Sequence, residues 1–204
     1  KRFLNRFMAL AMMSWMVLLP LRAVADDIDL FVGASTGASG NSNVLLVFDN
    51  TSNWSRNNQH FVGISSVGAM EAGVAATVVS GLTDTGINIG VMEYVTKSGN
   101  YNFGGFVRSA IKPMNVGTNQ TSLVARLNSM AGNVNDPDEK LNSNIPYGGL
   151  MYDIYNYLSG SNAWASPGAI PNSVSVSADE SAYTSTAHTQ FKSPLSCGTP
   201  SSPA

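Results

Sequence analysis

The stretch that decides the fold reads Asn43-Val44-Leu45-Leu46-Val47-Phe48-Asp49, an unbroken apolar run closed by a carboxylate. Because apolar residues stand at consecutive positions, a strand made from this run must be buried on both faces. An open sheet buries both faces by placing helices on either side, so the run predicts an α/β fold with this strand at its centre. Loops at the carboxyl ends of such strands bind ligands, and here that loop is Asp49-Asn50-Thr51-Ser52-Asn53.

The chain beyond this run contains further predicted helices and strands. Apolar residues at three- and four-residue intervals predict helices over residues 57–82, 121–131 and 146–159. Strand-like runs at 87–95 and 103–111 are joined by a short loop that contains glycine, with no helix between them. We therefore expect a doubly wound, mostly parallel α/β sheet with an antiparallel edge hairpin.

Each predicted helix carries an apolar stripe, and that of the second comprises Leu123, Val124, Leu127 and Met130. The stripe of the first is weakened by glycines and comprises Phe61, Ile64, Val67, Met70, Val74, Val78 and Val79. The stripe of the third is expected to be buried and comprises Leu150, Met151, Ile154, Tyr155 and Leu158. Residues 161–204 are dominated by Ser, Ala, Pro, Asn and Thr with little periodicity, which predicts an exposed insertion or disordered loop.

Composition indicates a globular chain that is not a general nucleic-acid binder. Of 204 residues, 44% are hydrophobic and 12% are charged, about half the charged share of an average soluble protein. Four of the eleven Lys and Arg residues fall within residues 1–25, so residues 26–204 carry seven basic against thirteen acidic side chains, a net charge of −6. Without basic residues nearby, we expect packing inside the fold rather than a nucleic-acid stacking platform for Tyr147, Tyr152, Tyr155, Tyr157 and Trp164.

Residues 1–25 have the three parts of a secretory signal peptide. Basic residues come first, an apolar run extends from Phe7 to Leu19, and Ala23-Val24-Ala25 ends the segment. A helix made from the apolar run would span about 20 Å, less than the hydrocarbon core of about 30 Å. We therefore expect export with cleavage after Ala25, and N-terminal sequencing of the secreted form should begin at Asp26. Cys197 is the only cysteine, so no internal disulfide can form.

The predicted organisation is a signal peptide at 1–25, an α/β domain at 26–160 and an insertion at 161–204. Lys1 stands where Met is expected, and the chain stops at Ala204 without a closing element. A central strand also needs a neighbour on each side. We therefore expect a truncated domain with one unpaired strand flank, whose solubility and unfolding cooperativity increase when the chain is extended. A sharp monomeric unfolding transition of residues 26–204 would contradict that expectation.

Three other patterns have ordinary structural explanations. Gly33-Ala34-Ser35-Thr36-Gly37 matches the nucleophile elbow of α/β hydrolases but lacks the helix that must follow the serine. His60 and His188 have no reason to approach this serine and are expected to be surface or half-buried residues. Asp136-Pro137-Asp138-Glu139 lacks the ligand spacing of a calcium loop and predicts a solvated turn.

The strongest candidate site is the loop after the apolar run. Asp49, Thr51 and Asn53 place three oxygen-bearing side chains on one side of a tight turn, a ligand type that suits Mg²⁺, Mn²⁺ or Ca²⁺. The same residue types also fit an N-cap, which accepts hydrogen bonds from the free N–H groups of a following helix. Spacing alone leaves both interpretations open. Three side chains supply a minority of the six to eight oxygens that Ca²⁺ takes, so any site here should be weak.

The order of these segments resembles that of the von Willebrand factor type A domain, and more narrowly the N-terminal type A region of PilY-type pilus assembly and tip adhesin proteins of Gram-negative bacteria. The resemblance covers about residues 26–197. It is carried by the segments Asn43–Trp54, Ile89–Met92, Gly104–Met114, Tyr147–Gly160 and Phe191–Cys197.

The resemblance implies a metal-ion-dependent adhesion site built on Asp-x-Ser-x-Ser. Asp49 matches this motif, Thr51 keeps the hydroxyl, and Asn53 departs from serine. Ile145-Pro146 stands where related sequences often have Thr-Pro, and the final aspartate of the site would lie beyond Ala204. The resemblance therefore implies a degraded or incomplete site, with Mg²⁺ or Ca²⁺ bound weakly or not at all.

These observations favour a non-enzymatic, exported component of type IV pilus assembly or adhesion. Its location would be the periplasm, outer membrane or cell surface, and its partners would be pilus proteins or host and surface ligands. The alternative is another secreted type A protein that uses a divalent cation to capture an acidic ligand group. An enzyme is disfavoured because no nucleophile, base and orienting residue can be placed together.

Overall fold

The computed structural model describes residues 41–51, 53–56, 62–63, 66–82, 86–97, 99–141 and 147–195. The predicted signal peptide, Ser35, His60 and Cys197 lie outside these ranges, as does Ile145-Pro146. Contacts divide the chain into Lys1–Ser39 and Gly40–Ala204, and every described residue belongs to the second unit.

The described sheet has the strand order β1-β2-β3, with β1 at Ser42–Phe48, β2 at Ile87–Tyr94 and β3 at Gly105–Pro113. β1 pairs with β2 in parallel and β2 pairs with β3 antiparallel. The predicted α/β class and the antiparallel edge hairpin are therefore confirmed. In the described part of the sheet β1 lies at the edge with one flank unpaired, and Val47 is 41% exposed. A neighbour on that flank is not among the described residues, so the central position of the strand stays a prediction.

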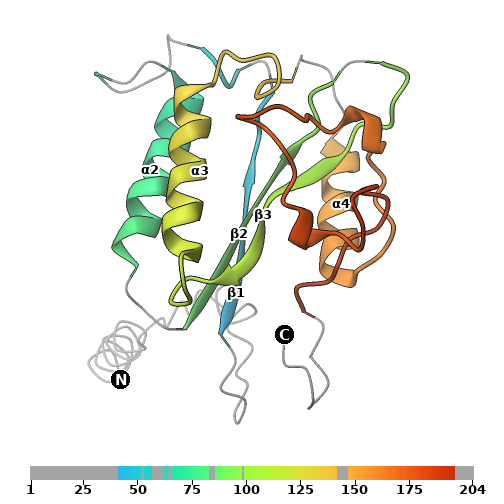
Figure 1. Cartoon of the computed structure of the whole chain (residues 1–204). Helices are drawn as coiled ribbons and strands as arrows, with labels where there is room; N and C mark the ends of the chain where they lie inside the picture. Colours follow the sequence, from blue (N-terminus) through green and yellow to red (C-terminus); the bar gives the residue numbers. More distant parts are fainter. Residues whose placement is uncertain are drawn as a thin grey trace, which may run out of the picture. The chain divides into compact units, whose positions relative to one another are not determined.

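Helices cover both faces of this sheet (Figure 1). On one face, α2 at Val67–Gly81 and α3 at Asn119–Gly132 pack side by side and share an apolar cluster with residues of β1 and β2. On the other face, α4 at Tyr147–Ser159 joins a second apolar cluster. The helices predicted at 121–131 and 146–159 are confirmed. Within the described ranges, no helix is long and apolar enough to cross a membrane.

The first helix begins later than predicted, because Ser66 rather than Asn57 lies at its start. The Ser66 hydroxyl accepts a hydrogen bond from the Ala69 N–H at 3.3 Å and caps α2. The buried face of α2 consists mainly of small residues, whereas Val74 and Val78 are 56% and 58% exposed. The apolar stripe therefore does not mark the face of α2 that packs on the sheet.

The buried face of α4 also differs from the prediction. Leu150 is buried as expected, but Met151 and Tyr155 are each 64% exposed. Polar residues replace them inside, since Asp153 and Asn156 are buried. Asp153 explains this orientation of α4, because its carboxylate accepts three backbone hydrogen bonds in the interior.

The predicted exposed loop at 161–204 is wrong for its described part, residues 161–195. This segment is irregular, with short 3-10 helices at Pro167–Ala169 and Glu180–Ala182, but it contributes to the core. It also covers the outer edge of β3: the Tyr183 hydroxyl and the Asp179 carboxylate accept hydrogen bonds from the Val107 and Ala110 N–H groups. Its core residues are Ala165, Ala169, Ile170, Val176, Ala178, Ala182, Tyr183 and Phe191.

Candidate functional site

Asp49 is exposed at the carboxyl end of β1, where the predicted site lies. Its Oδ1 accepts a hydrogen bond from the Thr51 N–H at 3.2 Å, which closes a tight turn. Its Oδ2 accepts a hydrogen bond from the Tyr147 hydroxyl at 2.8 Å, which connects this turn to the first residue of α4. The structure thus brings Asp49 and Thr51 together, while Asn53 is exposed and bonds through its carbonyl to the Arg56 N–H.

The helix-capping interpretation of Asp49 is wrong. Ser66 caps α2, and Asp49 caps only its own turn. Asp49 therefore remains at the surface with its carboxylate available to solvent and to Tyr147.

A buried tyrosine lies next to this pair. The Tyr94 side chain at the end of β2 is fully buried, and its hydroxyl has no hydrogen-bond partner among the described residues. Its ring packs edge-on against the Tyr147 ring, with centroids 6.0 Å apart. Burial raises the pKa of Tyr94 to about 12, and the charge of Asp49 acts in the same direction. Burial also raises the pKa of the Glu71 carboxyl, with a further contribution from Asp49.

Asn50 turns inward beside Asp49 and fixes the position of the loop. Its side-chain Oδ1 accepts a hydrogen bond from the Tyr94 N–H at 3.0 Å, and its Nδ2 donates to the Tyr94 and Glu139 carbonyls at 3.2 and 3.0 Å. Its own carbonyl accepts a hydrogen bond from the Leu141 N–H at 2.8 Å. A fully buried amide with these partners joins β1, β2 and the loop after α3 into one rigid support.

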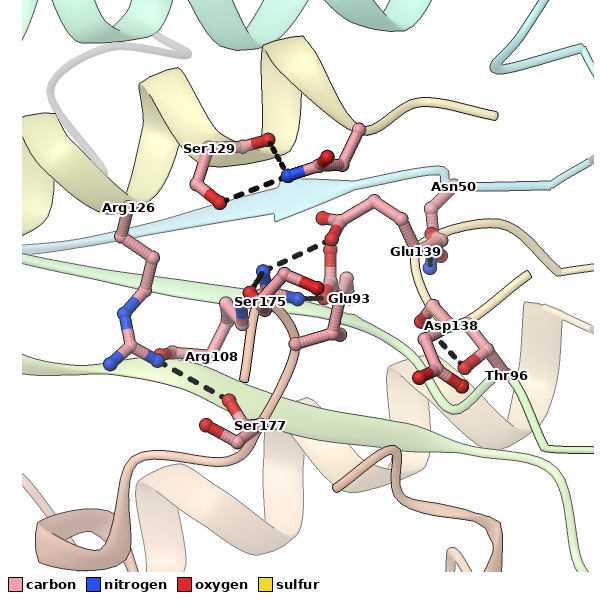
Figure 2. Close-up of polar contacts among 12 residues, drawn as sticks. Asn50, Glu93, Thr96, Arg108, Arg126, Ser129, Asp138, Glu139, Ser175 and Ser177 are labelled. Atoms are coloured by element: carbon pink, nitrogen blue, oxygen red, sulfur yellow. Dashed lines mark hydrogen bonds and ion pairs between the residues drawn. The ribbon is translucent and has the colours of Figure 1, made fainter. Parts of the chain in front are cut away.

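A buried ionic network lies behind Asn50 (Figure 2). Arg108 on β3 donates to the Glu93 carboxylate at 2.6 Å and to the Glu139 carboxylate at 3.1 Å, and all three side chains are at most 1% exposed. Arg108 also donates to the Ser175 carbonyl at 2.8 Å. Arg126 on α3 donates to the Arg108 carbonyl and to the Ser177 carbonyl. The network therefore connects the sheet, α3 and the irregular segment.

The charges of this network are not evenly matched. Burial raises the pKa of Glu93 to about 8 against the opposing effect of Arg108, and the nearby Glu139 raises it further. Burial likewise raises the pKa of Glu139 and lowers that of Arg126. Glu93 Oε2 and Glu139 Oε1 lack hydrogen-bond partners among the described residues. Two buried carboxyls that share one guanidinium are expected to retain a proton near neutral pH.

Sequence reasoning missed this network. The prediction of a solvated turn at 136–139 is wrong for Glu139, which is fully buried, although Asp136 does form a turn by accepting the Asp138 N–H at 2.9 Å. One signal was present: Arg108 and Glu93 interrupt otherwise apolar strands, and a buried charge requires a partner of opposite sign.

Two observations bear on the predicted cation site at Asp49. In the part of the chain that the structure describes, no group of three or more His, Cys, Asp or Glu residues is arranged to hold a metal ion. Both Asp49 oxygens already accept a hydrogen bond, so a cation would compete with the Thr51 N–H and the Tyr147 hydroxyl for this carboxylate.

The remaining predicted sites are less informative. His188 is half-buried, as expected, and its Nε2 lies 2.9 Å from Glu180. The prediction that the tyrosines of α4 and Trp164 pack inside is right for Tyr157 but wrong for the others, which are exposed: Tyr147, Tyr152, Tyr155 and Trp164. Comparisons with protein-family models, curated proteins and solved structures found no match for this chain.

Proposed function

We propose that this chain is an exported component of type IV pilus assembly or adhesion that acts through protein interaction. The resemblance to PilY-type proteins supports the pilus assignment, and the parallel and antiparallel strand pairs agree with the expected α/β class. The contact surface is the carboxyl end of β1. Its partners are pilus proteins or ligands on a host or other surface.

The observation that carries this proposal is the exposed Asp49–Tyr147 pair on its rigid base. Tyr147 is 61% exposed, and tyrosine is enriched at protein interfaces because it offers a large apolar surface with a polar end. Asn50 holds the loop in place, so a partner would not have to order it. An interaction role therefore needs neither a cofactor nor a reaction.

Co-sedimentation with purified type IV pili of the source bacterium tests the proposal. We expect the wild-type chain to pellet with pili and Asp49→Ala to bind pili at least about tenfold more weakly, since removing an interface hot spot costs about 2 kcal/mol or more and about 1.4 kcal/mol is tenfold in Kd. Glu180→Ala is the matched control, because Glu180 is an exposed carboxylate whose neighbour Ser181 lines a hollow with Asn88 and Pro113, at the other end of the strands. Equal sedimentation of Asp49→Ala and wild type would rule out the Asp49 surface.

The second candidate is cation-dependent capture of an acidic ligand group at the same loop. It is favoured by the exposed Asp49 carboxylate beside Thr51, the two positions that match the type A motif. The same sedimentation with Mg²⁺ and then with EDTA separates the candidates, because only cation-dependent capture is lost when the cation is removed.

A further inference from the structure

Beside the first turn of α4 lies a hollow of about 300 Å³ lined by aromatic rings and glycine backbone. Tyr152 and Trp164 form two of its walls, with ring centroids 6.0 Å apart and ring planes inclined at 66°. Both rings remain accessible, since Tyr152 is 52% and Trp164 is 46% exposed. Phe103, Gly148 and Gly149 complete the lining. Neither Asp49 nor Tyr147 lines the hollow, although Gly148 follows Tyr147 in the chain, and a ligand here does not require the proposed pilus function.

A buried carboxylate holds the aromatic walls in place. Asp153 is fully buried, its Oδ1 accepts the Trp164 N–H at 2.6 Å, and its Oδ2 accepts the Ala165 and Gly105 N–H groups at 2.9 and 3.0 Å. These bonds fix the backbone that carries the Trp164 ring. The hollow is therefore built before a ligand arrives.

The hollow requires glycine at position 149 and leaves space for a side chain at position 148. A Cβ at Gly149 would lie 2.1 Å from the Phe103 carbonyl oxygen, so this position tolerates only glycine. A Cβ at Gly148 would meet no atom within 4 Å. A larger side chain at Gly148 can therefore fill the hollow without disturbing the backbone.

The charge around the hollow favours a cation. Asp153 is the only charged residue between residues 141 and 170, and the described ion pairs do not include it. The faces of the aromatic rings are also electrically negative, which attracts cations that have an apolar surface. The first-turn N–H groups of α4 act in the opposite direction, because a helix N-terminus attracts anions. Most of the lining is nevertheless apolar, which suits a cation with an apolar surface better than an anion.

We propose that this hollow binds a quaternary ammonium group, as carried by choline, against the Tyr152 and Trp164 rings. Such a group has the size and apolar surface for the hollow, and it interacts with ring faces without needing hydrogen bonds. Aromatic side chains that the sequence suggested as buried packing residues thus form a binding site at the surface.

Saturation-transfer NMR on ligand methyl resonances tests the proposal with the purified full chain. The probes are choline, its uncharged isostere 3,3-dimethylbutan-1-ol, and acetate. We expect choline to bind at least about threefold more tightly than the isostere, because a cation gains attraction to the ring faces that a neutral group lacks. Equal affinity for choline and the isostere, or a preference for acetate, would overturn the proposal.

Two variants locate the binding. Trp164→Leu removes one wall and Gly148→Leu fills the hollow, and each should weaken choline binding by about tenfold or more. Gly73→Leu makes the same change at an open position of α2 and should leave choline binding unchanged. Circular dichroism confirms that each variant is folded. Choline binding that persists in Gly148→Leu would place the ligand elsewhere and overturn the assignment.

Vesicle flotation then distinguishes a lipid headgroup from a soluble molecule as the source of the quaternary ammonium group. Binding to phosphatidylcholine vesicles but not to phosphatidylglycerol vesicles supports a lipid headgroup, whereas binding of free choline alone supports a soluble ligand. Binding of neither choline nor phosphatidylcholine vesicles contradicts the proposal.

Discussion

At the scale of single residues, the feature that sets the behaviour of the candidate site is Tyr147. Its hydroxyl donates to the same Asp49 carboxylate that a cation would need, and the turn uses the other oxygen for the Thr51 N–H. The Asp49 carboxylate therefore already accepts two hydrogen bonds. A cation must compete with these donors as well as lose its own water.

Calorimetric titration with Mg²⁺, Mn²⁺ and Ca²⁺ measures this competition. We expect millimolar affinity or none for the wild-type chain, because Asp49, Thr51 and Asn53 supply few of the oxygens that these ions require. Tyr147→Phe removes the competing hydroxyl and should raise cation affinity a few-fold, whereas Asp49→Ala should abolish any binding. Micromolar binding by the wild type that disappears in Asp49→Ala would favour cation-dependent adhesion instead.

At the scale of elements, the packing of α2 depends on a glycine near its start. A Cβ at Gly68 would lie 2.4 Å from the indole of Trp54, which is 1% exposed and packs edge-on against Phe48. This close approach positions α2 against the end of β1.

Gly68→Ala should therefore destabilise the protein by about 1–3 kcal/mol through overpacking, although alanine is the better helix former. The matched control is Gly73→Ala, at which a Cβ meets nothing within 4 Å, and this change should stabilise by about 0.5–1 kcal/mol. Urea unfolding of both variants measures the difference. Equal stability of the two would show that the contact between Trp54 and Gly68 does not constrain α2.

The edge of β1 is the other element with a distinctive property. Val44 and Val47 are 38% and 41% exposed, and an apolar groove of about 570 Å³ runs between β1 and α2. Residues 42–48 contain no charge or proline, the usual devices that prevent edge strands from pairing with other chains. The outer edge of β3, in contrast, is covered by the irregular segment.

We therefore expect concentration-dependent self-association through β1. Val47→Lys should lower the weight-average mass in sedimentation velocity, because a lysine on an edge strand opposes strand pairing. Val174→Lys is the control, since Val174 is fully exposed in the irregular segment. Association that is unaffected by Val47→Lys would show that β1 is not the contact.

At the scale of the whole molecule, the buried network couples the fold to pH. The pKa of Glu93 is about 8 in the folded protein and near the ordinary 4.5 when unfolded. Between these values the folded state holds a proton that the unfolded chain releases, so the free energy of unfolding falls as pH rises from 5 to 8. The slope is at most about 1.4 kcal/mol per pH unit for one proton.

Urea unfolding at pH 5.5, 6.5 and 7.5 measures this slope. Glu139→Gln removes the neighbouring negative charge and should reduce the slope, whereas Asp138→Asn, outside the ion pairs, should not. A free energy of unfolding that increases with pH over this range would contradict the assignment of a shared proton.

The parts of the fold that could be predicted are those determined by local pattern. The antiparallel pair β2–β3 and helix α3 follow from apolar runs, a short loop and regular spacing. The buried part of residues 161–195 could not be predicted, because its side chains are buried by contacts with β3 and α4 and not by any periodicity of their own. The predicted orientation of α4 is wrong, because hydrogen bonds hold Asp153 in the interior and leave Tyr155 exposed.

The candidate site was predictable only in part. Asp49 and Thr51 are close in sequence, so the turn between them follows from residue type and spacing. Tyr147 lies 98 residues further along the chain, and only the fold brings it to Asp49. The burial of Glu139 could not be predicted either, because its partner Arg108 lies on β3 and the sequence around Glu139 indicates a turn.

The most direct test of the proposed function is the number of type IV pili on the surface of the source bacterium, counted by electron microscopy after deletion of the gene. We expect deletion to remove most pili, the wild-type gene to restore them, Glu180→Ala to restore them equally and Asp49→Ala to restore far fewer. An unchanged number of pili and unchanged surface adhesion after deletion would contradict a role in pilus assembly or adhesion.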